Sequence, residues 1–317
     1  AYAIMAAWTV WRMARSDLAV GQALRPTRKP GGPHLEVFKR SLGHLAAFVL
    51  LTQASIVVDR LVATLTGVGG VASLDYAHFV TDSVRMLLAV PIATLALGQL
   101  GGLSWSDARA SVERAFTVLL FGSLLVSIFV WGLSEDIVTV LFRRGEFQQT
   151  ATELTSGALR GFALGAWAAT TGYVYLRVFN ATLRNREVAI AGAVSLAVNV
   201  ALDLALYGPL GVYGVALATS VSAVVFLALL AIWSGTARTL FVHTGIPVLL
   251  LAPLAIVLPR LPVQGVLALL LGASVTGAAG VLVLVVWPPL RNDLRWALAR
   301  LGRRAESPPG EHSGAGD

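Results

Sequence analysis

The chain of 317 residues contains no cysteine, which excludes disulfide bonds, a thiolate nucleophile and a cysteine-based metal site. Its five histidines are scattered, and none belongs to an HExxH motif. A Walker A loop, a GxSxG elbow and an acidic DxD-like pair are absent as well. The sequence therefore predicts no catalytic site and no metal site, and we expect a protein that is not an enzyme and needs no cofactor.

Charged residues are scarce, at 13% of the chain against 56% hydrophobic residues, whereas about a quarter of a soluble domain is charged. A helix needs roughly 20 apolar residues to cross the hydrocarbon of a membrane. Segments of this kind are predicted at residues 42–63, 77–100, 112–133, 154–179, 187–207, 212–233, 242–259 and 263–287. The expected fold is all-α: a polytopic transmembrane helix bundle of about eight spans.

The net charge of +7 has a placement that favours a membrane topology over a nucleic-acid partner. Most Lys and Arg residues fall on the side that holds the basic loop at 12–38 and the polar tail at 291–317. We therefore expect a multi-pass protein of the bacterial cytoplasmic membrane, with its C-terminus in the cytoplasm and no nucleic-acid binding. Residues 1–11 are apolar but too short to span, and are interpreted as the end of a truncated transmembrane helix. Residues 134–149 mix apolar and charged residues, which suits a helix at the outer interface.

Ionisable residues inside the second span form one helical stripe. His78, Asp82 and Arg85 follow the spacing i, i+4, i+7, which places them on the same face. Such groups are expensive at membrane depth and normally face a cavity or a partner. They are either the wall of a wet cavity that contacts a charged substrate, or an internal ion pair that locks two helices.

Further candidates for the cavity lie in other spans. Asp59 and Arg60 end the first span, as an interfacial anchor pair or at the outer mouth of the cavity. Arg160 enters the fourth span from outside, where it snorkels to the headgroups or contacts substrate. Asn199 shares a face with Asp203 in the fifth span, and its side chain either forms interhelical hydrogen bonds or has a functional role. Asp203 is close to the outer end of the span and is expected to be solvated.

Glycines at 157, 161 and 165 form a small-xxx-small ladder in the fourth span. This pattern predicts close packing against another helix, because backbones approach closely only where side chains are small.

Several segments together resemble the MurJ/MviN lipid II flippase family, and the resemblance is good over about residues 37–235. The LFRRGEF element at 141–147 is its most specific part. The other segments are VDRLVATL (58–65), DYAHFVTD (75–82), ALRGFALGAW (158–167), RVFNATLRNREV (177–188), SLAVNVALDLAL (195–206) and GPLGVYGVALATSVS (208–222).

The resemblance implies a fold of fourteen helices, with two six-helix lobes around a cavity and a C-terminal helix pair that forms a lipid-tail groove. On that basis residues 39–235 are the second lobe and residues 236–290 the groove. It implies transport of lipid II, or a similar polyprenyl-pyrophosphate glycolipid, from the inner to the outer leaflet by alternating access. The expected partners are this substrate, membrane lipid, the N-terminal lobe of the same protein and cell-wall synthesis proteins.

One departure from the family concerns an arginine. The family commonly has an Asp-Arg pair where this chain has His78 and Phe79, and Arg85 is the proposed substitute. Two alternatives stay open: an exporter of another polyprenyl-linked glycan in the same superfamily, and a transport-incompetent scaffold for cell-wall synthesis. The cavity candidates are therefore Arg85, Asp82, His78, Asp59, Arg60, Arg160 and Asn199.

Overall fold

The computed structural model describes residues 33–100, 105–145 and 147–295. The chain forms two compact units, residues 1–43 and 44–317. Of the first unit the structure describes only residues 33–43, which are the first turns of a helix. The predicted helix end at 1–11, most of the predicted loop and the end of the C-terminal tail lie outside the described residues.

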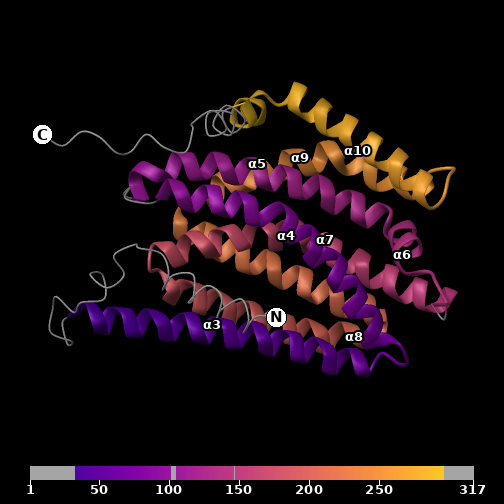
Figure 1. Ribbon diagram of the computed structural model, residues 1–317, viewed down its shortest axis with the longest axis horizontal. Helices are drawn as coiled ribbons and strands as arrows, with labels where there is room; N and C mark the ends of the chain where they lie inside the picture. Colours follow the sequence, from indigo (N-terminus) through magenta and orange to yellow (C-terminus); the bar gives the residue numbers. More distant parts are fainter. Residues whose placement is uncertain (1–32, 101–104, 146, 296–317) are drawn as a thin grey trace, which may run out of the picture. The chain divides into compact units, whose positions relative to one another are not determined.

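Regular structure in the described residues is entirely helical, which confirms the predicted all-α class (Figure 1). The helices are α3 (Pro33–Thr64), α4 (Gly70–Leu100), α5 (Trp105–Gly132), α6 (Ser134–Phe142), α7 (Gln149–Ala181), α8 (Asn185–Ser234), α9 (Ala237–Val257), the 3-10 turn η1 (Leu258–Arg260) and α10 (Val266–Val286). The predicted loop at 12–38 is wrong in its last residues, because α3 begins at Pro33. Proline is well suited to the first helical position, where its missing N–H has no partner to lose.

Membrane-spanning helices are evident by length and composition. Four stretches are long and apolar enough to cross a membrane: Leu42–Thr64, Asn185–Ser234, Ala237–Arg260 and Val266–Val286. A fifth is obtained if Phe116–Gly132 and Ser134–Phe142, which are bent by 76° at their junction, count as one span. The count of eight spans stays a prediction.

Helix α8 is a helical hairpin rather than one straight rod. Its backbone leaves the helical region at Gly211, where φ is 57° and ψ is −140°. The Ser195 hydroxyl donates to the Ser222 carbonyl over 2.7 Å, and Arg184 Nη2 donates to the Trp233 carbonyl over 3.1 Å. Residues that far apart in sequence meet only if residues 185–210 and 212–234 run antiparallel, since an α-helix rises about 1.5 Å per residue. The spans predicted at residues 187–207 and 212–233 correspond to these two halves of α8.

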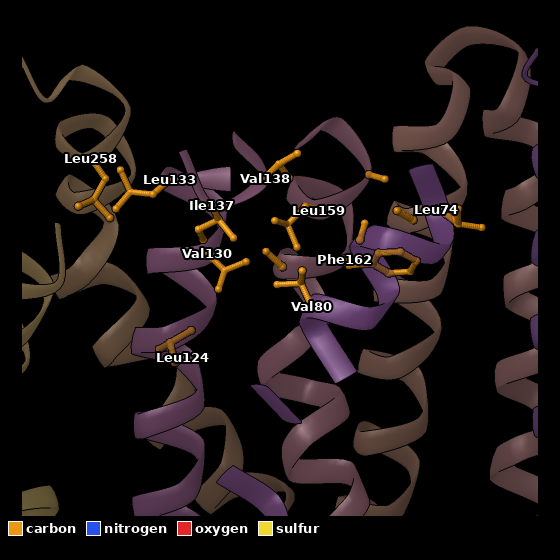
Figure 2. Close-up of a cluster of buried hydrophobic side chains, with 14 of the residues drawn as sticks. Leu74, Val80, Leu124, Val130, Leu133, Ile137, Val138, Leu159, Phe162 and Leu258 are labelled. Atoms are coloured by element: carbon orange, nitrogen blue, oxygen red, sulfur yellow. The ribbon is translucent and has the colours of Figure 1, made fainter. Parts of the chain in front are cut away.

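The core is centred on α7, which packs against α4, α5, α6 and α8. One buried apolar cluster includes Val138 of α6, Leu159 of α7 and Leu258 of η1 (Figure 2). A second cluster joins α4, α5, α7 and α8 around Phe179 and Leu230.

The glycine ladder of α7 explains how closely the second half of α8 approaches. A Cβ at Gly165 would lie 2.4 Å from Ser220 Cα, and one at Gly161 would lie 2.7 Å from Ala216 Cβ. Ser220 Oγ lies 2.6 Å from the Gly161 carbonyl and 3.0 Å from the Gly165 amide, so the contact is also hydrogen-bonded. The predicted close packing is confirmed at Gly161 and Gly165. It is wrong at Gly157, where a Cβ would meet nothing within 4 Å.

Candidate functional site

The predicted stripe on α4 is a connected charged network. Arg85 Nη2 lies 2.8 Å from Asp82 Oδ1, and His78 Nε2 lies 3.3 Å from Asp82 Oδ2. The three side chains are 39%, 37% and 30% exposed in the order His78, Asp82, Arg85. Arg85 Nε is buried without a hydrogen-bond partner among the described residues. The network is therefore an ion pair within α4 that keeps part of its surface open, and it does not join two helices as the second alternative expected.

A small polar cavity lies beside this stripe. It has a volume of about 60 Å³ and is bounded by α4, α7 and the second half of α8. The charged network of α4 forms one wall, and Phe162 and Gly165 of α7 and Thr219 of α8 belong to the others. A water molecule needs roughly 10–15 Å³ of such space, so the cavity holds a few waters or one small polar group. Phe79 is 65% exposed and does not line it.

Behind Thr219 lies a buried cluster of oxygen-rich side chains. Asn199 Nδ2 lies 2.5 Å from Asp59 Oδ1 and 3.0 Å from Asp203 Oδ2, and Thr219 Oγ1 lies 3.1 Å from Asp59 Oδ2. Asp59 is 7% exposed, and Asn199 and Asp203 are fully buried. The expectation that Asp203 is solvated is therefore wrong. The hairpin of α8 turns this residue inward against α3.

The chemistry of this cluster is that of a site for a proton or a small hard cation. Asn199 Oδ1 and Asp203 Oδ1 are buried with no hydrogen-bond partner among the described residues. No Lys or Arg of the described residues forms an ion pair with Asp59 or Asp203. Two buried carboxyl groups without a counter-charge are costly unless a proton or cation neutralises them. Carboxylate, amide and hydroxyl oxygens are the ligands that hard cations prefer.

The two remaining arginine candidates lie away from the cavity. Arg60 Nε pairs with Asp75 Oδ1 at 3.0 Å in an exposed ion pair, while its neighbour Asp59 points into the lobe. Consecutive residues of a helix do not share a face, so of the two residues predicted as interfacial anchors only Arg60 is exposed, while Asp59 is buried. Arg160 Nε donates to Ser134 Oγ over 2.7 Å and its Nη2 lies 4.0 Å from Glu135, which ties α7 to α6. Neither arginine lines the cavity.

An apolar groove on another face of α7 was not predicted from the sequence. It has a volume of about 340 Å³ and runs between α5, α7 and α9. Trp131 of α5, Trp167 of α7 and Leu251 of α9 belong to its walls, and Ser127 is one of its few polar residues. The sequence shows Trp131 and Trp167 on two separate helices, but only the fold brings them together in one groove.

Comparisons with known proteins agree with this architecture. The family model described as Lipid II flippase MurJ matches residues 11–287. A protein of Rhizobium meliloti (strain 1021), named probable lipid II flippase MurJ, is 29% identical over 210 residues, covering 64% of this chain and 39% of that protein. The correspondingly named protein of Thermotoga maritima is 27% identical over 198 residues, covering 62% of this chain and 41% of that protein.

A solved structure titled "Lipid II flippase MurJ, inward closed conformation" has a similar fold. It superposes with a TM-score of 0.63 at 20% identity, over 74% of this chain and 50% of that chain. This chain spans about two fifths of the length of the two curated relatives. Because the family model matches most of the sequence, the chain belongs to the lipid II flippase MurJ family.

Proposed function

We propose that this chain is the lobe of a lipid II flippase that contacts the headgroup and tail of the substrate during its passage from the inner to the outer leaflet. The observation that carries the proposal is the partly exposed network of His78, Asp82 and Arg85 on α4, in a chain that belongs to the MurJ family. A polar headgroup cannot cross bare hydrocarbon, because its hydrogen-bonding groups and charges would lose their water. A polar wall inside a membrane bundle removes much of that cost.

Arg85 is the group that pairs with the pyrophosphate of the substrate. A guanidinium presents five donors in a fork that matches phosphate oxygens, and in Arg85 the contact with Asp82 engages Nη2 while Nε has no partner among the described residues. Asp82 holds the arginine in place, with His78 on its other oxygen. Arg85 thereby fills the role of the arginine that Phe79 replaces.

The apolar groove between α5, α7 and α9 is the proposed binding site of the isoprenoid tail. Its walls are mainly apolar, and Trp131, Trp167 and Leu251 line it. An isoprenoid tail in lipid is already out of water, so the groove of about 340 Å³ would hold a segment of it by van der Waals packing. The groove uses only the first helix of the predicted C-terminal pair; a groove between α9 and α10 stays a prediction.

The buried cluster of Asp59, Asn199 and Asp203 supplies the site for a coupling ion. Its unpartnered oxygens and its lack of a counter-charge among the described residues support a bound proton or small cation. Thr219 is hydrogen-bonded to Asp59 and also lines the cavity beside Arg85. A proton or cation bound at the cluster therefore affects the cavity wall through the side chain of Thr219.

Alternating access needs a second lobe on the other side of the headgroup. We assign that role to an N-terminal lobe of the same protein, and we place the cytoplasm at the ends of α7 and α8 that carry Arg177 and Arg184, following the distribution of basic residues. Inverted or repeated lobes that rock around a central site are the common construction of secondary transporters.

The test replaces Arg85 by Ala and by Lys in the complete protein and measures the lipid II that becomes accessible in the outer leaflet. The matched control is Arg177→Ala, which removes an exposed arginine bonded to Tyr173 on α7. We expect Arg85→Ala to lower transport about tenfold or more, because charge-assisted hydrogen bonds to phosphate are lost. Arg85→Lys should fall between, since it keeps the charge but not the fork, and the control should match the unsubstituted protein.

Three other outcomes would contradict parts of the proposal. Full transport by Arg85→Ala removes the assigned role of the arginine. Transport of a different polyprenyl-linked glycan, with lipid II left behind, favours the alternative exporter. Binding of cell-wall synthesis proteins by an unsubstituted protein that moves no lipid favours the scaffold, for which the replacement of the family arginine by Phe79 is the supporting observation.

A further inference from the structure

One carboxylate on α4 is shared by an arginine and a histidine. Asp82 Oδ1 lies 2.8 Å from Arg85 Nη2, and Asp82 Oδ2 lies 3.3 Å from His78 Nε2. All three side chains line the same small cavity. The arginine is permanently charged, whereas histidine is the side chain that ordinarily changes its charge near neutral pH. The net charge of this wall therefore depends on whether the His78 ring carries one proton or two.

The contacts of His78 indicate where a second proton would bind. An ionised carboxylate only accepts hydrogen bonds, so the Nε2 atom that faces Asp82 carries the proton of the neutral ring. The Nδ1 atom is then the acceptor of a second proton, and the cavity of about 60 Å³ has room for the water that delivers it. Phe162 of α7 packs edge-on against the ring, with centroids 5.4 Å apart and an interplanar angle of 72°. The ring can therefore gain a charge without turning away from Asp82.

Charged groups from the other elements act on His78 whether or not a substrate is present. The walls that α7 and α8 contribute to the cavity are apolar or hydroxyl-bearing. From α3, Asp59 lies behind Thr219 and attracts a positive charge on His78. Asp75 is engaged by Arg60 in an exposed ion pair. The charges that change their pairing when an anion enters the cavity are therefore those of the α4 network itself.

We propose that binding of the substrate pyrophosphate is accompanied by uptake of a proton at Nδ1 of His78. This inference rests on the proposed function, because it takes Arg85 as the group that pairs with the pyrophosphate. Without substrate, the charges of Asp82 and Arg85 compensate each other. A bound phosphate group claims part of the guanidinium, so Asp82 loses part of its counter-charge and lies near a second anion. A proton on His78 places a new positive charge beside the other oxygen of Asp82 and restores the balance.

The linkage between the proton and the anion has a definite sign. A bound anion stabilises the doubly protonated ring, so the complex holds a proton that the free protein does not. Affinity for the pyrophosphate is then highest at mildly acidic pH. It falls as the pH rises through the range in which histidine titrates, by at most about tenfold per pH unit for one proton. The proton also reduces the net negative charge of the complex, which is costly at membrane depth.

The experiment measures proton uptake by isothermal titration calorimetry of the complete protein in lipid nanodiscs. The ligand is lipid II with a farnesyl chain, whose pyrophosphate diester stays ionised throughout the range in which histidine titrates. Titrations in Mops and in imidazole buffer, which differ in ionisation enthalpy, give the number of protons taken up for each bound ligand. We expect uptake of about half a proton near neutral pH, and a dissociation constant that rises about three- to tenfold between about pH 6 and about pH 7.5.

Two variants and one control locate the proton. His78→Gln keeps a hydrogen-bond donor toward Asp82 but cannot titrate, so it should bind without proton uptake and about three- to tenfold more weakly than the unsubstituted protein at about pH 6. Asp82→Asn removes the carboxylate that the protonated ring needs, and should also bind without uptake. The matched control His44→Gln removes a histidine of α3 that does not line the cavity. Its proton uptake should equal that of the unsubstituted protein.

Each contrary result has a separate meaning. Binding of the ligand without proton uptake by the unsubstituted protein overturns this inference alone, as does uptake that persists in His78→Gln or disappears in His44→Gln. Uptake that persists in Asp82→Asn overturns the role of the shared carboxylate, because the charged ring would then contact the phosphate directly. Failure of the ligand to bind at any pH contradicts the proposed function, and this inference with it.

Discussion

A methyl group added at Gly165 tests how closely the two helices that carry the site must pack. The Cβ of alanine would lie 2.4 Å from Ser220 Cα and 2.7 Å from its carbonyl oxygen. Carbon atoms in ordinary contact are separated by about 3.5–4.0 Å, so α7 and the second half of α8 must move apart by about 1 Å. Neither neighbour is a flexible side-chain end, because both belong to the backbone of α8.

The magnitude follows from three terms. Overpacking costs about 1–3 kcal/mol, and loss of the hydrogen bonds between Ser220 and the α7 backbone costs about 1 kcal/mol each. Replacing glycine by alanine in a helix returns about 0.5–1 kcal/mol. The net expectation for Gly165→Ala is a loss of about 2–4 kcal/mol of unfolding free energy. The shift also moves Thr219 and its hydrogen bond to Asp59, so transport should fall by more than the loss of folded protein explains.

The assay is the thermal unfolding midpoint of the complete protein in detergent, measured together with lipid II transport. Gly165→Ala should lower the midpoint by about 5 °C or more. The matched control lies two turns earlier on the same helix: a Cβ at Gly157 meets nothing within 4 Å, so Gly157→Ala should keep or raise the midpoint. Equal midpoints for the two variants, or a Gly165→Ala protein as stable as the unsubstituted one, would refute the packing argument.

Two further predictions concern the buried cluster and the turn before α10. Asp203→Asn should leave the fold intact, because an amide has the shape of a carboxyl group. It should make transport insensitive to an imposed sodium or proton gradient, since one of the two proposed ion-binding carboxyls is lost. An unchanged gradient dependence in vesicles would count against a role of the cluster in ion coupling. Asp136→Ala removes the acceptor of the Gly265 amide, 2.6 Å away. We expect a loss of about 1–3 kcal/mol of stability from this unpaired amide, seen as faster proteolysis in the segment between α9 and α10 but unchanged lipid II selectivity.

Local patterns in the sequence were enough to predict most of the secondary structure and one part of the site. Long apolar runs specify helices because every backbone polar group must be paired inside lipid, and the predicted spans coincide with α3 to α5 and α7 to α10. The stripe of His78, Asp82 and Arg85 is also local, since residues at i, i+3, i+4 and i+7 share a face in any helix. The close approach at Gly161 and Gly165 followed from residue size alone.

Only the tertiary structure decided which polar groups meet across helices. The hairpin at Gly211 brings residues of both halves of α8 to Asp59, so that Asn199 and Thr219 donate hydrogen bonds to a carboxylate 140 and 160 residues away in sequence. Asp203 is bonded to Asn199 in the same cluster. No periodicity encodes such a meeting, because it depends on the turn between two helices and on the packing of a third.

The same reason separates the predicted arginines Arg60 and Arg160 from the cavity. Arg60 and Arg160 were candidates by their position in the chain, but the direction of each side chain depends on its neighbours. Arg60 pairs with the exposed Asp75, and Arg160 donates to the buried Ser134 of α6. Tyr76 lies in the second turn of α4, Phe142 is the last residue of α6, and Phe147 lies in the connection that follows α6, yet their rings contact one another. The sequence marks each residue as aromatic, and only the fold brings the three rings into one cluster, since side-chain direction across elements is set by packing rather than by local spacing.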